Sequence, residues 1–230
     1  MALHRDASSE TVGAEMSADL VHLNLRSAIR SRLLSLSSRV VSGTTISVAG
    51  NAFVDSANGF GSYSVGDEIT ASGFTTPANN GSFMVTGVTA GSLVVDAVLT
   101  NEAAGGVRQI AVGLPAGRAW EGRPFSPVIG RPYFSELMIP INSDVRALGL
   151  GGTIAHNVSA NLTLRYPSGK GTAAIERMAG AFMELFRPGT AMSYGGTSVT
   201  ILQAERRALI ADVDWVSCPV IIDAVSYTAN

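Results

Sequence analysis

Thr153–Met178, TIAHNVSANLTLRYPSGKGTAAIERM, holds a strand-like run, a turn and a helix-like run in direct succession. In the strand-like run, alternate positions carry a mostly apolar set: Ile154, His156, Val158, Ala160, Leu162, Leu164 and Tyr166. This period of two predicts a strand with one buried face, while the other face is wet or meets a polar partner. His156 has no histidine or cysteine near it in the sequence. We therefore interpret it as a core or end-of-strand residue and not as a ligand.

The turn Gly169-Lys170-Gly171-Thr172 resembles a phosphate-binding loop, which requires Gly-x-x-x-x-Gly-Lys-Ser/Thr. Leu164 occupies the position of the first glycine, and Gly171 stands where the loop needs a hydroxyl. Both ends of the motif fail. We interpret the segment as a strand stop and a two-glycine turn, with Thr172 as the cap of a helix from Ala173 to Phe186.

Another helix is predicted near the N-terminus, with Ser17 as its N-cap. Its core positions recur at helical spacing: Val21, Leu25, Ala28, Ile29, Leu33 and Leu36. Leu23 and Leu34 form a second, narrow apolar stripe beside Arg26 and Arg30. This stripe is either ordinary partial exposure or a contact between subunits.

Short alternating runs rich in Gly, Ser, Thr and Val follow from Ser42 to Val112 and predict an all-β module. Asn80-Gly81 predicts a tight primed turn, and Ala90-Gly91 predicts a second hairpin, so that neighbouring runs pair as a meander. DSANGFG, residues 55–61, has some character of a calcium loop but lacks its alternating carboxylates, and we interpret it as a turn.

Towards the C-terminus, YFSELMIPI and TSVTILQA predict strands, and Glu205-Arg206-Arg207 predicts a charged turn. A long strand is then expected from Ala208 to Tyr227. This run is apolar on both faces around Ile221, which suits a central strand or one covered by another subunit. Pro219 lacks an N–H, so a bulge or an edge pairing is expected there.

The composition excludes several classes of function. The net charge is −2 and Lys170 is the only lysine, which argues against sequence-specific DNA binding. The single cysteine, Cys218, rules out an internal disulfide and favours a small buried hydrophobe. The three histidines, His4, His22 and His156, are far apart. We find no catalytic set, no cofactor site and no metal site, and predict a protein that is not an enzyme.

No apolar run is long enough for a membrane helix, and the N-terminal residues lack the features of a secretory signal. We therefore expect no membrane contact and a protein that stays in the cytoplasm where it is made. Because 46% of the chain is hydrophobic, part of this surface must be buried inside or between subunits.

The order of six segments is similar to the tail-terminator-like proteins of long-tailed bacteriophages. The segments are AWEGRPFSP, RPYFSELMIP, NLTLRYPSGKGT, AAIERMAGAFMELF, GTSVTILQA and DWVSCPVIID. The residues that match the family pattern are Trp120, Glu121, Pro124, Phe125, Pro127, Pro132, Tyr133, Tyr166, Pro167, Gly169, Gly171, Asp214, Trp215, Pro219 and Val220. Gly122 stands where the family often has asparagine.

The resemblance implies an α+β fold in which an antiparallel or mixed sheet is packed by two main helices. Here an all-β small barrel or sandwich is inserted. The expected organisation is an N-terminal arm at 1–16, a tail-terminator-like domain at 17–41 plus 113–230, and the inserted β domain at 42–112. The family usually has only a short connection at that place, so the insert should project from the surface.

The resemblance also implies a structural virion protein that forms a ring, of six copies, on the end of the tail tube. Such a ring ends tail elongation and joins the tail to the head connector. The expected partners are further copies of the chain, the tail tube protein and the head-tail connector protein, with phage DNA passing through the lumen without sequence-specific binding. The protein would act in the tail or neck of the virion, after a stage in the host cytoplasm during assembly.

Three alternatives stay open. The protein could be another head-tail joining, neck or minor tail protein, with the β module as a decoration or surface-binding domain. The module could recognise a cell-surface glycan through its aromatic rings, which are Phe53, Phe60, Tyr63, Phe74 and Phe83. The third alternative is a nucleotide enzyme, in which nucleotide binding would depend on Lys170.

Overall fold

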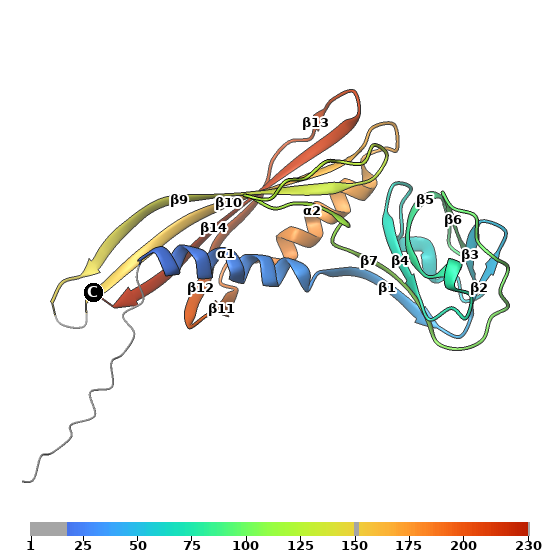
Figure 1. Cartoon of the computed structure of the whole chain (residues 1–230), viewed down its shortest axis with the longest axis horizontal. Coiled ribbons are helices and arrows are strands. Elements are labelled where there is room, and N and C mark those ends of the chain that lie inside the picture. The colour runs from blue at the N-terminus through green and yellow to red at the C-terminus, as the bar shows by residue number, and fades with distance from the viewer. Residues whose placement is uncertain (1–17, 150–151, 230) are drawn as a thin grey trace, which may run out of the picture.

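The computed structural model describes residues 18–149 and 152–229. The predicted N-terminal arm at 1–16, the N-cap Ser17 and His4 lie outside the described residues. The described chain forms two seven-stranded sheets and two α-helices, and Figure 1 shows the sheets at opposite ends of an elongated molecule. Their buried apolar side chains form one continuous core.

The predicted α+β class is wrong, because the protein is mostly β. Half of the residues lie in strands and 17% lie in helices. The chain has two separate sheets, and the second is built around three strands of 15 residues each, β9, β10 and β14. Two helices therefore cover only part of one sheet. The local predictions of strand and helix were largely right, but the strand predicted at 133–141 continues to Ala147.

The first sheet takes its strands from residues 37–113 and is antiparallel throughout. Its order is β1-β7-β4-β5-β6-β3-β2. The strands are β1 (Ser37–Gly43), β2 (Ile46–Ala49), β3 (Ala52–Asp55), β4 (Glu68–Ser72), β5 (Gly81–Thr89), β6 (Ser92–Val95) and β7 (Arg108–Gly113). The consecutive strands β4, β5 and β6 form a meander, and the predicted Ala90-Gly91 hairpin between β5 and β6 is confirmed.

The predicted primed turn at Asn80-Gly81 is wrong. Asn80 has φ −102° and Gly81 already begins β5, whereas a primed turn needs positive φ at both residues. The chain reverses earlier, through the short helix η2 (Pro77–Asn79). The Asn80 amide then closes this loop, since it accepts the N–H of Phe74 and donates to the carbonyls of Phe74 and Thr76.

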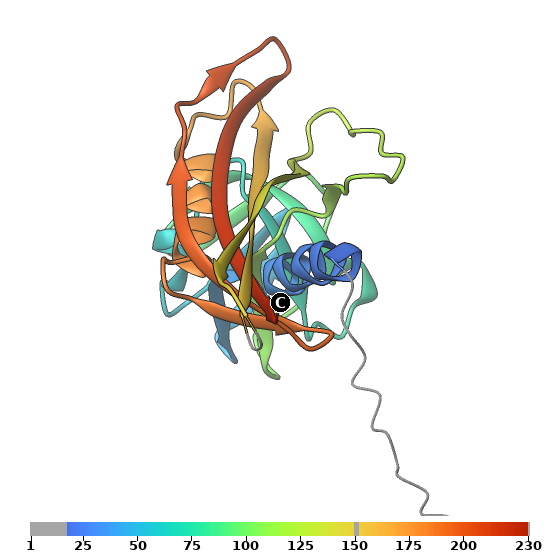
Figure 2. The ribbon, with the colours of Figure 1, turned by 90° about the vertical axis from the view of Figure 1, so that its left-hand side faces the viewer.

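The second sheet has the order β11-β12-β14-β10-β9-β8, with β13 paired to β14 off this path. Its strands are β8 (Gly117–Ala119), β9 (Tyr133–Ala147), β10 (Thr153–Pro167), β11 (Ala191–Tyr194), β12 (Thr197–Arg206), β13 (Ile210–Ala211) and β14 (Trp215–Ala229). Every pair is antiparallel except β8 with β9. Figure 2 shows that the long strands curve strongly and that the loop between β8 and β9 projects to one side.

The alternation predicted for β10 is confirmed, because Val158, Ala160, Leu162 and Leu164 are buried and the positions between them are half-buried. Both helices lie on this buried side of the second sheet. Helix α1 (Ala18–Leu34) packs on β11 and β12, and α2 (Ala173–Leu185) packs on β10, β12 and β14. Figure 1 shows both helices below the long strands.

The C-terminal strand differs from its prediction. The expected single run from Ala208 to Tyr227 is split, because the N–H of Asp212 bonds the carbonyl of Trp215 and the chain turns there. The expected charged turn is wrong too, since β12 continues through Arg206. β14 is central, as predicted around Ile221. Pro219 lies where the partner of β14 changes from β12 to β13, which accommodates its missing N–H.

Candidate assembly surfaces

Trp120 and Glu121, which precede β9, connect helix α1 to the second sheet. Trp120 packs edge-on against Phe134, with 5.0 Å between ring centroids, and the Arg30 guanidinium lies 4.9 Å from the centre of the Trp120 ring. Glu121 accepts a hydrogen bond from Arg26 at 2.9 Å. These family-motif residues therefore position α1 on the sheet.

A second aromatic cluster joins the other motif segments. Tyr133 lies 5.2 Å from Phe125 and 4.9 Å from Trp215, measured between ring centroids. The Arg165 guanidinium lies 5.4 Å from the centre of the Tyr133 ring. Four of the six motif segments thus meet at one end of β9, and their packing against one another gives a reason for their occurrence in one chain.

Two arginines bind the loop between β3 and β4, one from the same sheet and one from α2. Arg39 in β1 makes a two-pronged bond to the Asp67 carboxylate, at 2.8 and 2.9 Å, and also bonds the carbonyl of Ser62. Arg177 in α2 donates to the Ser62 carbonyl and to the Ser64 hydroxyl at 2.7 Å. Because the Asp67 side chain is fully buried, the Arg39–Asp67 pair is structural and not a surface contact. The Arg177 bonds form the junction between the first sheet and α2.

The Gly-Lys-Gly turn lies at the same junction. Gly169 and Gly171 have φ values of +76° and +78°, as a two-glycine turn requires. A Cβ placed on Gly66 of the first sheet would lie only 3.3 Å from the Cβ of Lys170. The turn therefore packs closely on the neighbouring module, which supports the structural interpretation of Lys170.

Thr172 stands at the N-cap of α2, but its side chain makes no capping bond to the backbone. The predicted helix cap is wrong in this respect. The hydroxyl bonds the Glu176 carboxylate instead, and this bond lowers the pKa of Glu176.

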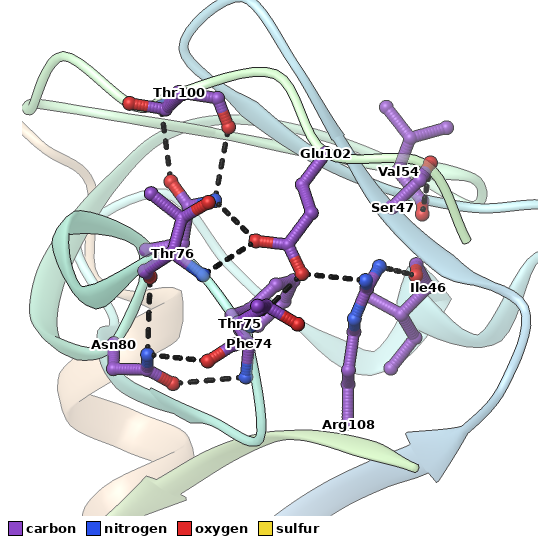
Figure 3. Close-up of polar contacts among 11 residues, drawn as sticks. Ile46, Ser47, Val54, Phe74, Thr75, Thr76, Asn80, Thr100, Glu102 and Arg108 are labelled. Atoms are coloured by element: carbon purple, nitrogen blue, oxygen red, sulfur yellow. Dashed lines mark hydrogen bonds and ion pairs between the residues drawn. The ribbon is translucent and has the colours of Figure 1, made fainter. Parts of the chain in front are cut away.

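The far end of the first sheet is held by a polar network around Glu102 (Figure 3). Its carboxylate accepts the N–H groups of Thr75 and Thr76, each at 3.0 Å, and bonds from Asn79 and Arg108 at 3.1 and 2.6 Å. Burial by itself would raise the pKa of Glu102, but these hydrogen bonds outweigh it and lower the pKa to about 2. These bonds therefore favour the charged form of the Glu102 carboxylate.

All charged side chains between residues 42 and 112 have partners inside the molecule. Asp55 accepts bonds from Thr45, Ala57 and Gly59, which confirms the turn interpretation of this segment. The remaining charged residues bond backbone or side-chain groups, and they are Asp67, Glu68, Asp96, Glu102 and Arg108. The outer surface of the module is therefore mostly uncharged.

The aromatic rings of the module are not available to a sugar. Phe53, Phe60, Tyr63, Phe74 and Phe83 are between 0% and 6% exposed and fill its core. Glycan recognition by stacking needs exposed rings, so this hypothesis loses the residues on which it depended.

The second sheet has one face that no helix or strand of the described residues covers. We call it the open face. It lies opposite the helices, and the pairing of β9, β10 and β14 places two rows on it: Leu137, Asn161 and Ile221, then Ile139, Ser159 and Asp223. Leu137 and Ile139 are 48% and 45% exposed, although both lie in regular strand structure.

Helix α1 also exposes apolar side chains, on its solvent side. Leu23 and Leu34 are 57% and 56% exposed, and Leu20 is 47% exposed. Together with two serines they form a stripe at helical spacing, the α1 stripe, made of Leu20, Leu23, Ser27, Ser31 and Leu34. The stripe contains no charged residue, and the sequence pattern that suggested it is confirmed as a solvent-facing row.

The free edge of β9 is protected against pairing with another strand. β8 covers only Tyr133–Ser135 of β9, so the edge beyond is open within the described residues. The N–H of Met138 on this edge is taken by Glu121 at 2.9 Å, Pro140 has no N–H, and the pairing is irregular at Ile141. Such features block edge-to-edge addition. This part of the β9 edge is therefore closed to strand pairing.

His156 is buried and satisfied, as the sequence predicted. Its two ring nitrogens lie 2.9 Å from the hydroxyls of Ser143 and Thr228. Burial, with a smaller contribution from His22 at 5.9 Å between ring centroids, lowers the pKa of His156. Cys218 is also buried, and burial raises the pKa of its thiol. Neither residue is placed for chemistry on a substrate.

Within residues 18–149 and 152–229, no group of three His, Cys, Asp or Glu side chains could hold a metal ion. No helix in the same part of the chain is long and apolar enough to cross a membrane.

Comparison with known proteins agrees with this architecture. Residues 95–223 match the family described as phage tail terminator protein. The match spans more than half of the 230 residues, so the chain belongs to this family, and the resemblance seen in its motifs is confirmed. The protein therefore has a structural role in a phage tail.

No curated protein sequence matches the chain. A solved structure without a descriptive name is similar over 50% of this chain and 79% of its own, with 21% identity and a TM-score of 0.38. That similarity is too low to define fold or function.

Sequence reasoning missed several residues of these surfaces. Leu20 could have been found, because it continues the helical spacing of Leu23. The role of Glu121 at the Met138 N–H had no signal in the sequence, since 17 residues separate the two partners. The position of Asp223 on the open face likewise had no signal in the sequence, because it follows from the pairing of β14 with β10.

Proposed function

We propose that the protein forms a ring, of six copies, that caps the completed tail tube. In this role it ends tail elongation and joins the tail to the head connector. The observation that carries the proposal is membership of the phage tail terminator family over residues 95–223.

The described surfaces support assembly of copies. The open face and the α1 stripe expose leucine and isoleucine side chains in regular elements, where a monomer would gain by covering them. They lie on opposite sides of the second sheet, an arrangement that suits a ring, in which each copy contacts two neighbours.

The experiment is to combine light scattering after gel filtration with electron microscopy of the purified chain, alone and with tail tubes. We expect closed rings, and tubes that carry a ring at one end and no longer grow. A chain that stays at 23.8 kDa at high concentration and leaves tube growth unchanged would contradict the proposal.

We further propose that residues 42–112 are an inserted β domain within a terminator domain formed by 17–41 and 113–230. The bonds from Arg177 of α2 to Ser62 and Ser64 support an insert held in a fixed orientation. The mostly uncharged outer surface of the insert suits a decoration, or contact with another uncharged surface. This leaves another neck or minor tail protein as the second candidate, which a map of the virion would distinguish.

The remaining parts of the proposal follow from the ring. DNA would pass through its lumen without sequence-specific binding, which agrees with a net charge of −2. The expected partners are the tail tube protein and the head-tail connector protein, and the protein would not be an enzyme. It would assemble in the host cytoplasm and remain in the virion, without membrane contact.

A further inference from the structure

We infer that the α1 stripe of one copy lies on the open face of the next copy. This inference rests on the proposed ring and names the two surfaces that build it. The occupant of the open face is thus a second copy of this chain.

The two surfaces match in length and chemistry. Helix α1 has 17 residues and is about 25 Å long at 1.5 Å per residue. The open-face residues of β10, from Asn157 to Arg165, span roughly 30 Å at 3.3 Å per residue. The stripe is uncharged, and the open-face positions of β10 between these ends are uncharged as well: Ser159, Asn161 and Thr163.

Charge complementarity supports the same pairing. Asp223 lies on the open face, half-buried, and its side chain has no hydrogen bond or ion pair among the described residues. Arg26 and Arg30 flank the α1 stripe and keep 30% and 25% of their side chains exposed. Arg26 uses only one guanidinium nitrogen on Glu121, so it has donors left for a carboxylate of the next copy.

The geometry favours head-to-tail contacts over a two-fold dimer. Helix α1 lies on the buried side of the second sheet, so its outer stripe and the open face point in opposite directions. A two-fold contact that used only one surface would leave the other exposed. Strand addition at β9 is blocked by Glu121 and Pro140, which leaves face-to-helix packing.

The test uses two full-length variants, Leu23→Asp in the stripe and Ile139→Asp in the open face. Each substitution introduces a charge into one surface and leaves the other intact. The concentration needed for assembly should rise at least about tenfold for each variant. Val98→Asp is the matched control, because Val98 is 93% exposed in the inserted module, and it should assemble like the unmodified chain.

Mixing the two variants distinguishes the mode of contact. The intact stripe of the Ile139 variant can dock on the intact open face of the Leu23 variant. The stripe of the Leu23 variant and the open face of the Ile139 variant each carry the introduced charge and cannot dock. The mixture should give a one-to-one dimer of twice the chain mass and no ring, measured by light scattering and native mass spectrometry.

Each other outcome has a definite meaning. If the unmodified chain forms rings and the variants do too, or if the mixture gives no dimer, the inference is overturned and the proposed ring stands. If the unmodified chain forms no ring, the proposed function itself fails. Leu23→Ser and Ile139→Thr replace any aspartate variant whose circular dichroism shows unfolding, and they should weaken assembly in the same direction.

Discussion

His156 shows how a buried polar residue couples stability to pH. Its ring bonds two hydroxyls and lies beside His22, so the folded protein holds it neutral. The pKa of His156 is lowered in the folded state, and the folded chain therefore binds fewer protons than the unfolded chain.

Stability should consequently be complete above the unfolded pKa of about 6.5 and fall as the pH drops below it. Urea unfolding at pH 8 and pH 5 measures this loss. His156→Gln removes the titrating group, and the difference between the two pH values should shrink. An equally large difference in the variant would assign the pH dependence to other groups.

Glu121 combines two contacts in one carboxylate, a bond to Arg26 of α1 and a bond to the Met138 N–H on the edge of β9. Glu121→Ala removes both and should lower the free energy of unfolding by about 1–2 kcal/mol. Glu121→Gln keeps an amide oxygen for Met138 and should lose less. Equal losses in the two variants would show that the edge bond contributes nothing.

At the scale of elements, Arg39 fixes β1 to the loop before β4 within the first sheet. Its side chain is 12% exposed, and the Asp67 side chain that it binds is fully buried. Removing one partner of a buried pair leaves an uncompensated charge, which costs far more than the pair contributes.

Arg39→Ala should therefore lower the free energy of unfolding by about 3–5 kcal/mol, measured by denaturant titration. Arg39→Lys keeps the charge without the two-pronged geometry, and its loss should be smaller. Arg187→Ala, at an exposed ion pair with Glu184, is the matched control and should lose less than about 1 kcal/mol. A small loss for Arg39→Ala would contradict a structural role for the buried pair.

The periodic elements could be predicted from sequence because burial repeats along them. The alternation of β10 and the spacing of α1 and α2 gave their faces correctly, within a residue or two at the ends. Asn80-Gly81 failed because the Asn80 side chain bonds the backbone of Phe74, a contact that no turn rule contains. The length of β9 failed because this strand continues past Ile141 to Ala147, where it pairs with β10.

At the scale of the whole molecule, the module joins the chain at two paired residues. Gly43 of β1 and Arg108 of β7 are direct partners in the first sheet. A two-residue Asn-Gly turn can therefore replace residues 44–107 without a change in the positions of these strands.

The shortened chain, with Ile110→Thr to remove a newly exposed apolar side chain, should still assemble, because the open face and the α1 stripe lie outside the excised residues. Light scattering and electron microscopy measure this. A folded but monomeric product would show that the module takes part in the contacts between copies and is not a decoration.

The sequence by itself determined the strand-turn-helix unit, the failure of the phosphate loop and the ordered motifs of a tail terminator. These depend on periodicity and on residues close together along the chain. Only the tertiary structure decided the mostly β class, the burial of the module's rings, the Arg39–Asp67 pair and which face of the second sheet stays open. Those features depend on partners brought together by strand pairing and helix packing, and no local pattern in the sequence records such partners.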